Sequence, residues 1–260
     1  MPKRSSLAAL PLLVALSFPC NAADRLGIVL IHGKSGLPQQ MSALAQILKL
    51  QDWLTEQPEM CWSRNRIYDR TYPECLRELD PAITRLKSGG GSAIVLLGMS
   101  LGGNAALGYA ATNTGLKGIV TIVPAHTPEL ISLRPEIAPE LRKAHNMIAA
   151  GRGNEKTTFN DINTRTTAYN FSVSTTPNIY LSFFAPDSAA VMPSNAVRLA
   201  VPLLYVSATH DPTQRGRWYI YDRVHQHAQS RYVTVNTDHI GALAASPQVV
   251  VNWLKALMQP

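Results

Sequence analysis

Short apolar runs rich in β-branched residues recur along the chain. Such runs are typical of strands that are buried on both faces of a parallel sheet. Between them lie segments in which apolar residues recur at helical spacing. The predicted strands are residues 27–31, 93–97, 118–123 and 201–206, and the predicted helices are residues 41–53, 75–87, 102–111 and 247–258. This alternation predicts an α/β fold, with a mostly parallel, doubly wound sheet covered by helices on both faces.

The alternation lapses after the third strand. Residues 138–150 are a further candidate helix, residues 151–178 are rich in Thr and Asn, and residues 179–193 return to apolar and aromatic side chains with prolines. Long insertions in compact domains are usually functional or disordered. We interpret residues 126–200 as a cap-like insertion before the last of these strands, with a decorated surface loop as the alternative.

The N-terminus begins Met-Pro-Lys-Arg, runs apolar over residues 7–18 and then reads Cys-Asn-Ala-Ala. A basic start, a short hydrophobic segment and small residues at a cleavage site are typical of an export signal. We predict that residues 1–23 are a signal peptide and that residues 24–260 form one domain in the periplasm or outside the cell. A buried N-terminal helix is the alternative, but Pro11 and Pro19 would interrupt it.

Composition and charge narrow the possible partners. The chain is 46% hydrophobic and 16% charged, as in a globular protein, and loss of Lys3 and Arg4 with the signal would reduce its formal charge from +7 to +5. The basic residues are scattered and form no run, so we expect no nucleic-acid partner. No other long apolar run follows, and Pro19 disfavours a lipid anchor on Cys20, so we expect no stable membrane anchor.

Two cysteines remain after signal removal, Cys61 and Cys75. An even pair in an oxidising compartment predicts a disulfide, which stabilises by about 3 kcal/mol for a short loop. The residues between them, 62–74, have the polar character of a surface excursion. Two unrelated buried thiols are the alternative.

The segment Gly98-Met99-Ser100-Leu101-Gly102 matches the pattern Gly-x-Ser-x-Gly. A serine hydroxyl is a poor nucleophile and must project from a sharp turn where a base can reach it, and flanking glycines remove the Cβ atoms that would collide there. Short matches arise by chance, but this one lies between a predicted strand and a predicted helix. Ser100 is therefore the candidate nucleophile.

A second loop follows the first predicted strand and reads His32-Gly33-Lys34. Acyl transfer generates an oxyanion, which two backbone N–H groups fixed in advance can stabilise. The candidates for this oxyanion hole are the N–H groups of Lys34 and Leu101. We expect His32 to shape the loop by hydrogen bonding rather than to act as a base, and the Lys34 side chain to point to solvent.

These motifs carry a resemblance. The order of a His-Gly loop, a Gly-x-Ser-x-Gly elbow, a late acid and a final histidine resembles the α/β-hydrolase superfamily. The resemblance covers residues 25–257, except the segment from residue 126 to about residue 200, where such folds vary most. It implies a catalytic triad whose members follow in the order nucleophile, acid, histidine, and it identifies no subfamily.

The acid of such a triad should follow the strand after the insertion. There the sequence Thr209-His210-Asp211 ends a buried run and places a carboxylate at the same sheet edge as Ser100. Asp211 is therefore the candidate acid. Asp187, inside the insertion, and Asp222, on a predicted helix, are the alternatives.

The base should lie on a loop from which its ring can reach both Ser100 and the acid. His239 follows a last predicted strand, residues 231–235, and precedes the final helix. It is the candidate base, and we expect Asp238 beside it to serve the turn. The competing histidines are His210, His225 and His227.

The resemblance implies a serine hydrolase that works through an acyl-enzyme without a metal or an organic cofactor. Its substrate would be a small acyl compound, a carboxylic ester first, with thioesters or activated amides next. Two other classes stay open, an acyltransferase with the same triad and a non-catalytic binding protein on the same fold. The apolar side chains that could line an acyl pocket or fill the core are Phe183, Phe184, Met192 and Trp218.

Overall fold

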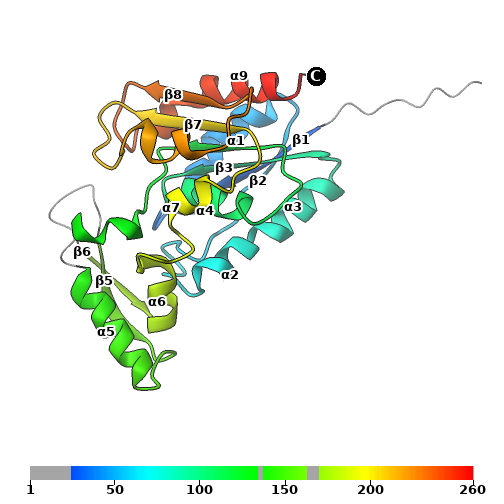
Figure 1. Cartoon of the computed structure of the whole chain (residues 1–260). Coiled ribbons are helices and arrows are strands. Elements are labelled where there is room, and N and C mark those ends of the chain that lie inside the picture. The colour runs from blue at the N-terminus through cyan, green and yellow to red at the C-terminus, as the bar shows by residue number, and fades with distance from the viewer. Residues whose placement is uncertain (1–24, 134–136, 163–169, 260) are drawn as a thin grey trace, which may run out of the picture.

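The computed structural model describes residues 25–133, 137–162 and 170–259 (Figure 1). Its centre is a six-stranded sheet in the order β2-β1-β3-β4-β7-β8, and every neighbouring pair in it is parallel. The strands are β1 Leu26–Ile31, β2 Leu54–Glu56, β3 Ala93–Met99, β4 Gly118–Ile122, β7 Leu203–Ala208 and β8 Arg231–Val235. The fold class predicted from the sequence is confirmed.

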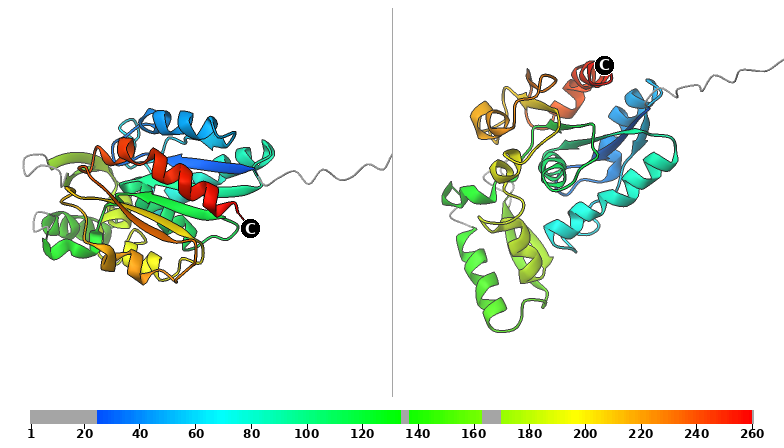
Figure 2. Two further views of the ribbon diagram at one scale, coloured as in Figure 1. Left: turned by 90° about the horizontal axis from the view of Figure 1, so that it is seen from above. Right: turned by 45° about the vertical axis from the view of Figure 1, so that its right-hand side comes forward.

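Helices cover both faces of the sheet (Figures 1 and 2). Successive strand residues point to opposite faces, so Ile28 and Leu30 pack with α1 and α9 while Val29 and Ile31 pack with α2, α3 and α4. The helices are α1 Ser42–Lys49, α2 Tyr72–Arg77, α3 Leu79–Ser88, α4 Leu101–Ala110, α7 Met192–Ala196, α8 Ala242–Ala245 and α9 Pro247–Leu257. Short 3-10 helices are η1 Pro38–Met41, η2 Pro128–Leu133, η3 Arg217–Tyr219 and η4 Tyr221–Arg223.

One predicted helix differs from the structure. The segment 75–87 forms two helices, α2 and α3, which part at Glu78. The first begins earlier than its apolar spacing indicates because Thr71 caps it. The Glu74 carboxylate accepts hydrogen bonds from the Thr71 N–H at 2.9 Å and from its hydroxyl at 2.6 Å, and the first of these satisfies a backbone donor that a helix start leaves open.

The insertion extends from one end of the sheet (Figure 1). It contains α5 Ala138–Ala149, the antiparallel pair β5 Thr157–Ile162 and β6 Asn170–Thr175, and α6 Pro177–Phe184. The helix was predicted, but the hairpin in the Thr- and Asn-rich stretch was not. Only one face of this hairpin is apolar, where Phe159 pairs with Val173 and both are buried, so the stretch carries a weak hydrophobic signal.

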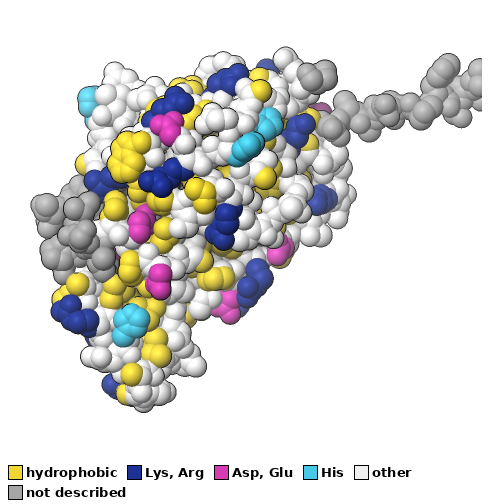
Figure 3. Space-filling model, in the orientation of Figure 1, with side chains coloured by type: hydrophobic (Ala, Val, Ile, Leu, Met, Phe, Trp, Pro, Cys, Tyr) yellow, Lys and Arg dark blue, Asp and Glu magenta, His cyan; other side chains and the backbone are white. Residues whose placement is uncertain are grey.

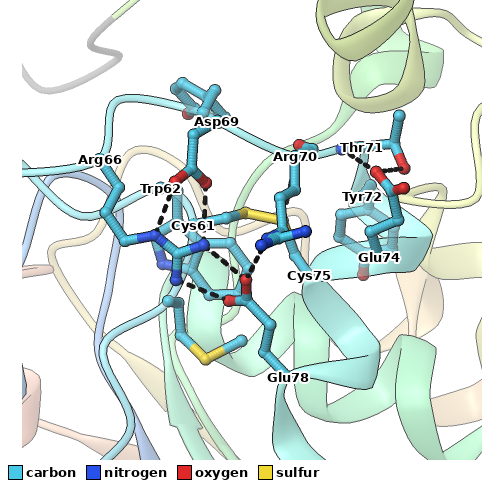
Figure 4. Close-up of a disulfide and its surroundings, with 12 residues drawn as sticks. Cys61, Trp62, Arg66, Asp69, Arg70, Thr71, Tyr72, Glu74, Cys75 and Glu78 are labelled. Carbon is cyan, nitrogen blue, oxygen red and sulfur yellow. Dashed lines mark hydrogen bonds and ion pairs between the residues drawn. A yellow bond between two sulfur atoms is a disulfide. The ribbon is translucent and has the colours of Figure 1, made fainter.

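The structure joins Cys61 and Cys75 in a disulfide, with the Cα atoms 5.7 Å apart (Figure 4). The expectation that the enclosed loop is a surface excursion was wrong, because Trp62, Tyr68 and Tyr72 are fully or almost fully buried. The charged residues of the loop stay outside the core. Arg66 pairs with Asp69 at 2.9 Å and with Glu78 at 2.5 Å, and Arg70 pairs with Glu78 at 3.1 Å.

The surface drawn in Figure 3 carries Lys and Arg side chains scattered among Asp, Glu and apolar groups. No helix in the described part of the chain is long and apolar enough to span a bilayer. The predicted signal peptide lies outside the described residues.

Loss of the disulfide should lower stability, because the bridge restricts the unfolded chain. For the double variant Cys61→Ala, Cys75→Ala we expect a loss of about 3 kcal/mol, which for a chain of this size corresponds to a fall of about 6 to 12 °C in thermal midpoint. Thermal unfolding of the oxidised chain 24–260 and of the variant measures this. Reductant should lower the midpoint of the parent protein and leave that of the variant unchanged; two reactive thiols in the non-reduced, unfolded parent would contradict the bridge.

Candidate active site

Ser100 stands between β3 and α4 in a backbone conformation that L residues seldom adopt, with φ 54° and ψ −121°. The end of the neighbouring strand β4 and the segment just after it hold it there. The Ser100 N–H donates to the Ile122 carbonyl at 3.0 Å, and the Ser100 carbonyl accepts from the Ala125 N–H at 3.2 Å. These contacts support a strained turn that projects the hydroxyl from the sheet edge.

The glycines on either side of Ser100 are required by close backbone contacts. A Cβ on Gly98 would overlap the carbonyl oxygen of Gly102, and a Cβ on Gly102 would overlap the carbonyl oxygen of Ile31 at the end of β1. The strand, the helix and the neighbouring strand therefore approach one another more closely than any larger residue allows.

Ser100, His239 and Asp211 form one hydrogen-bonded chain. The His239 Nε2 lies 3.0 Å from the Ser100 Oγ, and the His239 Nδ1 lies 2.6 Å from the Asp211 Oδ2. Asp211 follows β7 and His239 follows β8, so both come from the same carboxyl edge of the parallel sheet as Ser100. Because a carboxylate only accepts, Nδ1–H donates to Asp211 and Nε2 can accept the Ser100 proton.

The Asp211 carboxylate is buried and fully occupied. Its Oδ1 accepts from the backbone N–H and from the hydroxyl of Thr213, both at 2.8 Å. Burial by itself raises the pKa of Asp211, but the hydrogen bond and charge interaction with His239, together with the bonds from Thr213, outweigh it and hold the pKa below its ordinary value. Asp211 is thus poised to stay ionised beside the imidazole.

The loop after β1 lies directly against Ser100. A Cβ built on Gly33 would stand 3.3 Å from the Ser100 Cβ. Among the described residues, neither the Lys34 N–H nor the Leu101 N–H has an acceptor, and the Leu101 N–H is the first of helix α4. Both backbone donors that the sequence proposed for an oxyanion hole are therefore available.

His32 holds this loop, as expected from the sequence. Its Nε2 accepts from the Met60 N–H at 3.0 Å, so its Nδ1 carries the proton and donates to the Gly33 carbonyl at 2.8 Å. The same carbonyl accepts from the Gly36 N–H at 3.0 Å. Because N–H and C=O point in opposite directions across a trans peptide, these two bonds aim the Lys34 N–H away from His32.

The Lys34 side chain does not point to solvent, and that expectation was wrong. Its Nζ donates to the buried Asp161 Oδ1 at 2.7 Å. Sequence reasoning missed this partner, 127 residues away, because no local pattern connects the two. It also missed Thr213, whose position two residues after Asp211 is the signal of a local turn.

The competing residues lie apart from this hydrogen-bonded chain. Asp238 accepts from the N–H groups of Ile240 at 3.0 Å and Gly241 at 2.7 Å and so closes a turn, as expected. Phe183, Phe184 and Met192 are core residues, whereas Trp218 is 61% exposed. The other candidate acids and bases, all exposed at the surface, are Asp187, Asp222, His210, His225 and His227.

Among the residues that the structure describes, no three or more His, Cys, Asp or Glu side chains are arranged to hold a metal ion.

Acid should destabilise the fold through His32. Burial lowers its pKa from the ordinary value of 6.5. As the pH drops through that value, the unfolded chain therefore binds more protons than the folded one, and the free energy of unfolding decreases. We expect the thermal midpoint to fall less between about pH 7 and about pH 5 in His32→Gln than in the parent protein, because the amide gains no proton. Equal losses in the two proteins would contradict this assignment.

No protein-family model and no curated protein matches the sequence. Solved structures are similar in fold. Est1E from Butyrivibrio proteoclasticus, solved with ferulic acid, has a TM-score of 0.65 at 15% identity over 92% of each chain. A monoacylglycerol lipase from Paleococcus ferrophilus has a TM-score of 0.64 at 17% identity, covering 89% of this chain and 94% of the lipase.

A third similar structure is a metagenome-derived lipolytic enzyme of the pair LipS and LipT. It has a TM-score of 0.63 at 16% identity, covering 91% of this chain and 94% of the enzyme. The parallel sheet, the strained turn between β3 and α4 and these likenesses lead to one conclusion. The chain has the α/β-hydrolase fold.

Proposed function

We propose that the protein is an exported serine hydrolase that cleaves a carboxylic ester through an acyl-enzyme, with Ser100 as nucleophile, His239 as general base and Asp211 as its orienting acid. The observation that carries the proposal is the continuous chain from Ser100 Oγ through both ring nitrogens of His239 to Asp211, at 3.0 Å and 2.6 Å. His239 Nε2 can take the Ser100 proton across the first contact, while Asp211 orients the ring and stabilises the imidazolium without itself being protonated.

In the first half-reaction His239 Nε2 takes the Ser100 proton as Oγ attacks the acyl carbonyl carbon. The carbonyl oxygen becomes an oxyanion, for which the N–H groups of Lys34 and Leu101 are the proposed donors. The imidazolium, paired with Asp211, then protonates the leaving alkoxide, and the alcohol departs. Ser100 is left as an ester of the acid.

In the second half-reaction a water molecule takes the place of the alcohol. His239 removes its proton, the hydroxide attacks the acyl carbon and the same backbone groups receive the oxyanion. Return of the proton to Ser100 Oγ releases the carboxylic acid and restores the enzyme. Thioesters and activated amides are further substrates that this chemistry accepts.

Three further features support parts of the proposal. Structural neighbours are named as a monoacylglycerol lipase, a lipolytic enzyme and a thermophilic esterase. The Cys61–Cys75 bridge is consistent with an oxidising compartment, and therefore with export after cleavage of residues 1–23. We also propose that residues 126–200 act as a cap, since Asp161 on β5 of this insertion contacts Lys34, in the loop beside Ser100, at 2.7 Å.

A fluorophosphonate probe tests the nucleophile. We expect the parent protein to be labelled and to hydrolyse short-chain esters, because the probe requires a serine activated by its histidine. Ser100→Ala should lose both reactions. Ser63→Ala, which changes another buried serine, should keep both. A parent protein that neither reacts with the probe nor cleaves esters would favour the binding-protein alternative.

Asp211→Asn tests the orienting acid. The amide keeps the shape of the carboxylate but cannot hold His239 in the tautomer that accepts from Ser100, and we expect kcat to fall by about 10⁴-fold. Asp222→Asn, which changes an exposed carboxylate paired with Arg217, is the matched control and should retain full activity.

Product analysis with added alcohols measures whether water or an alcohol receives the acyl group.

A further inference from the structure

Lys34 connects two parts of the molecule that are distant in sequence. Its backbone belongs to the loop after β1, where its N–H is the proposed oxyanion donor. Its side chain leaves that loop and reaches the insertion, where the ammonium contacts Asp161 on β5 at 2.7 Å and faces the ring of Phe184 on α6 at 5.7 Å. The insertion therefore provides the contacts that fix the side chain.

Asp161 is an unusual partner because it is almost completely buried, with 2% of its side chain exposed. A buried carboxylate is costly unless both oxygens are satisfied. Lys34 satisfies Oδ1, and the buried Tyr68 hydroxyl donates to Oδ2 at 3.1 Å. Because Tyr68 already occupies Oδ2, the Lys34 ammonium has to lie at Oδ1 for the carboxylate to be fully paired.

The loop 61–75 holds both partners of this pair in place. Its Trp62 indole N–H donates to the His32 carbonyl at 3.2 Å, and its Trp62 carbonyl accepts from the Ser35 N–H at 3.0 Å, so Lys34 is bracketed on both sides. Toward the insertion, the Tyr68 carbonyl accepts from the Thr175 hydroxyl at 2.6 Å. The loop after β1 and the hairpin β5–β6 are thus both held by the loop 61–75.

We propose that Asp161 is a positioning residue for the proposed oxyanion hole, acting through the ammonium of Lys34. The inference rests on the proposed function. His32 and Gly36 fix the carbonyl of the peptide that carries the Lys34 N–H, and the ion pair with Asp161 anchors the side chain that leaves the Lys34 Cα at the other end of that peptide. The insertion thereby contributes to the chemical step and not only to the walls of the site.

Asp161→Asn tests this role. The amide has the size of the carboxylate and can still accept from Tyr68, but it removes the charge that holds Lys34. We expect kcat for a short soluble ester to fall by about tenfold with KM changed by less than about twofold, a smaller effect than deletion of an oxyanion donor. Asp52→Asn is the matched control: it removes the charge of a carboxylate that pairs with Arg25 at 2.9 Å, at the opposite end of β1 from Lys34, and should change kcat by less than about twofold.

A second measurement separates positioning from loss of structure. A trifluoromethyl ketone adds to Ser100 Oγ and places a negative oxygen in the oxyanion hole, whereas the corresponding unreactive amide binds without that charge. In Asp161→Asn the affinity for the ketone should fall in parallel with kcat, and the affinity for the amide should not change. Equal loss of both affinities, or a variant as active as the parent, would overturn the proposal.

The double variant Lys34→Met, Asp161→Asn completes the test without a buried unpaired charge. Because Asp161→Asn already releases the Lys34 side chain, we expect the double variant to lose no more kcat than Asp161→Asn alone. If the losses of kcat from Lys34→Met and from Asp161→Asn add in the double variant, the two residues are not coupled and the proposal is contradicted. A parent protein inactive toward esters and unlabelled at Ser100 would refute the proposed function. An active parent with full activity in Asp161→Asn would refute only the role of Asp161.

Discussion

The close approach of β3, α4 and β1 around Ser100 is the constraint on which the site depends. Ser100 has a positive φ, and no side chain at Gly98 or Gly102 could fit between the backbones that meet there. This packing fixes the hydroxyl, the first N–H of α4 and the end of β1 in one small volume. The strain of the turn is maintained by hydrogen bonds to the end of β4 and to Ala125 just after it, so a central strand of the sheet and the segment that continues it support the turn.

Parallel strands bring the remaining groups to the same edge. The loops after β1, β3, β7 and β8 carry, in turn, the Lys34 N–H, Ser100, Asp211 and His239, and the strand order places β3 within the sheet rather than at its border. Burial would neutralise an isolated carboxylate at this edge, but Asp211 is held ionised by His239 and Thr213. Fold and electrostatics thus favour the same arrangement of the three side chains.

The parts of the fold that could be predicted from the sequence are those governed by local patterns. Strands such as β3 are apolar throughout because both faces are covered, and the elbow at Ser100 has a glycine pattern imposed by backbone contact. The hairpin β5–β6 escaped prediction because only one of its faces is packed. The pair Lys34–Asp161 escaped because a tertiary contact across 127 residues leaves no periodic signal in either segment.

The disulfide that closes the loop between Cys61 and Cys75 constrains the order of oxidation and folding. Both sulfurs are buried, and the same loop supports the segment around Lys34 and the insertion. Oxidation therefore has to accompany the docking of these elements, since a finished interior would shield the thiols from an oxidant. In a compartment that keeps thiols reduced, the chain would contain every residue of the site. It would lack the covalent bond that constrains the loop between the segment around Lys34 and the insertion.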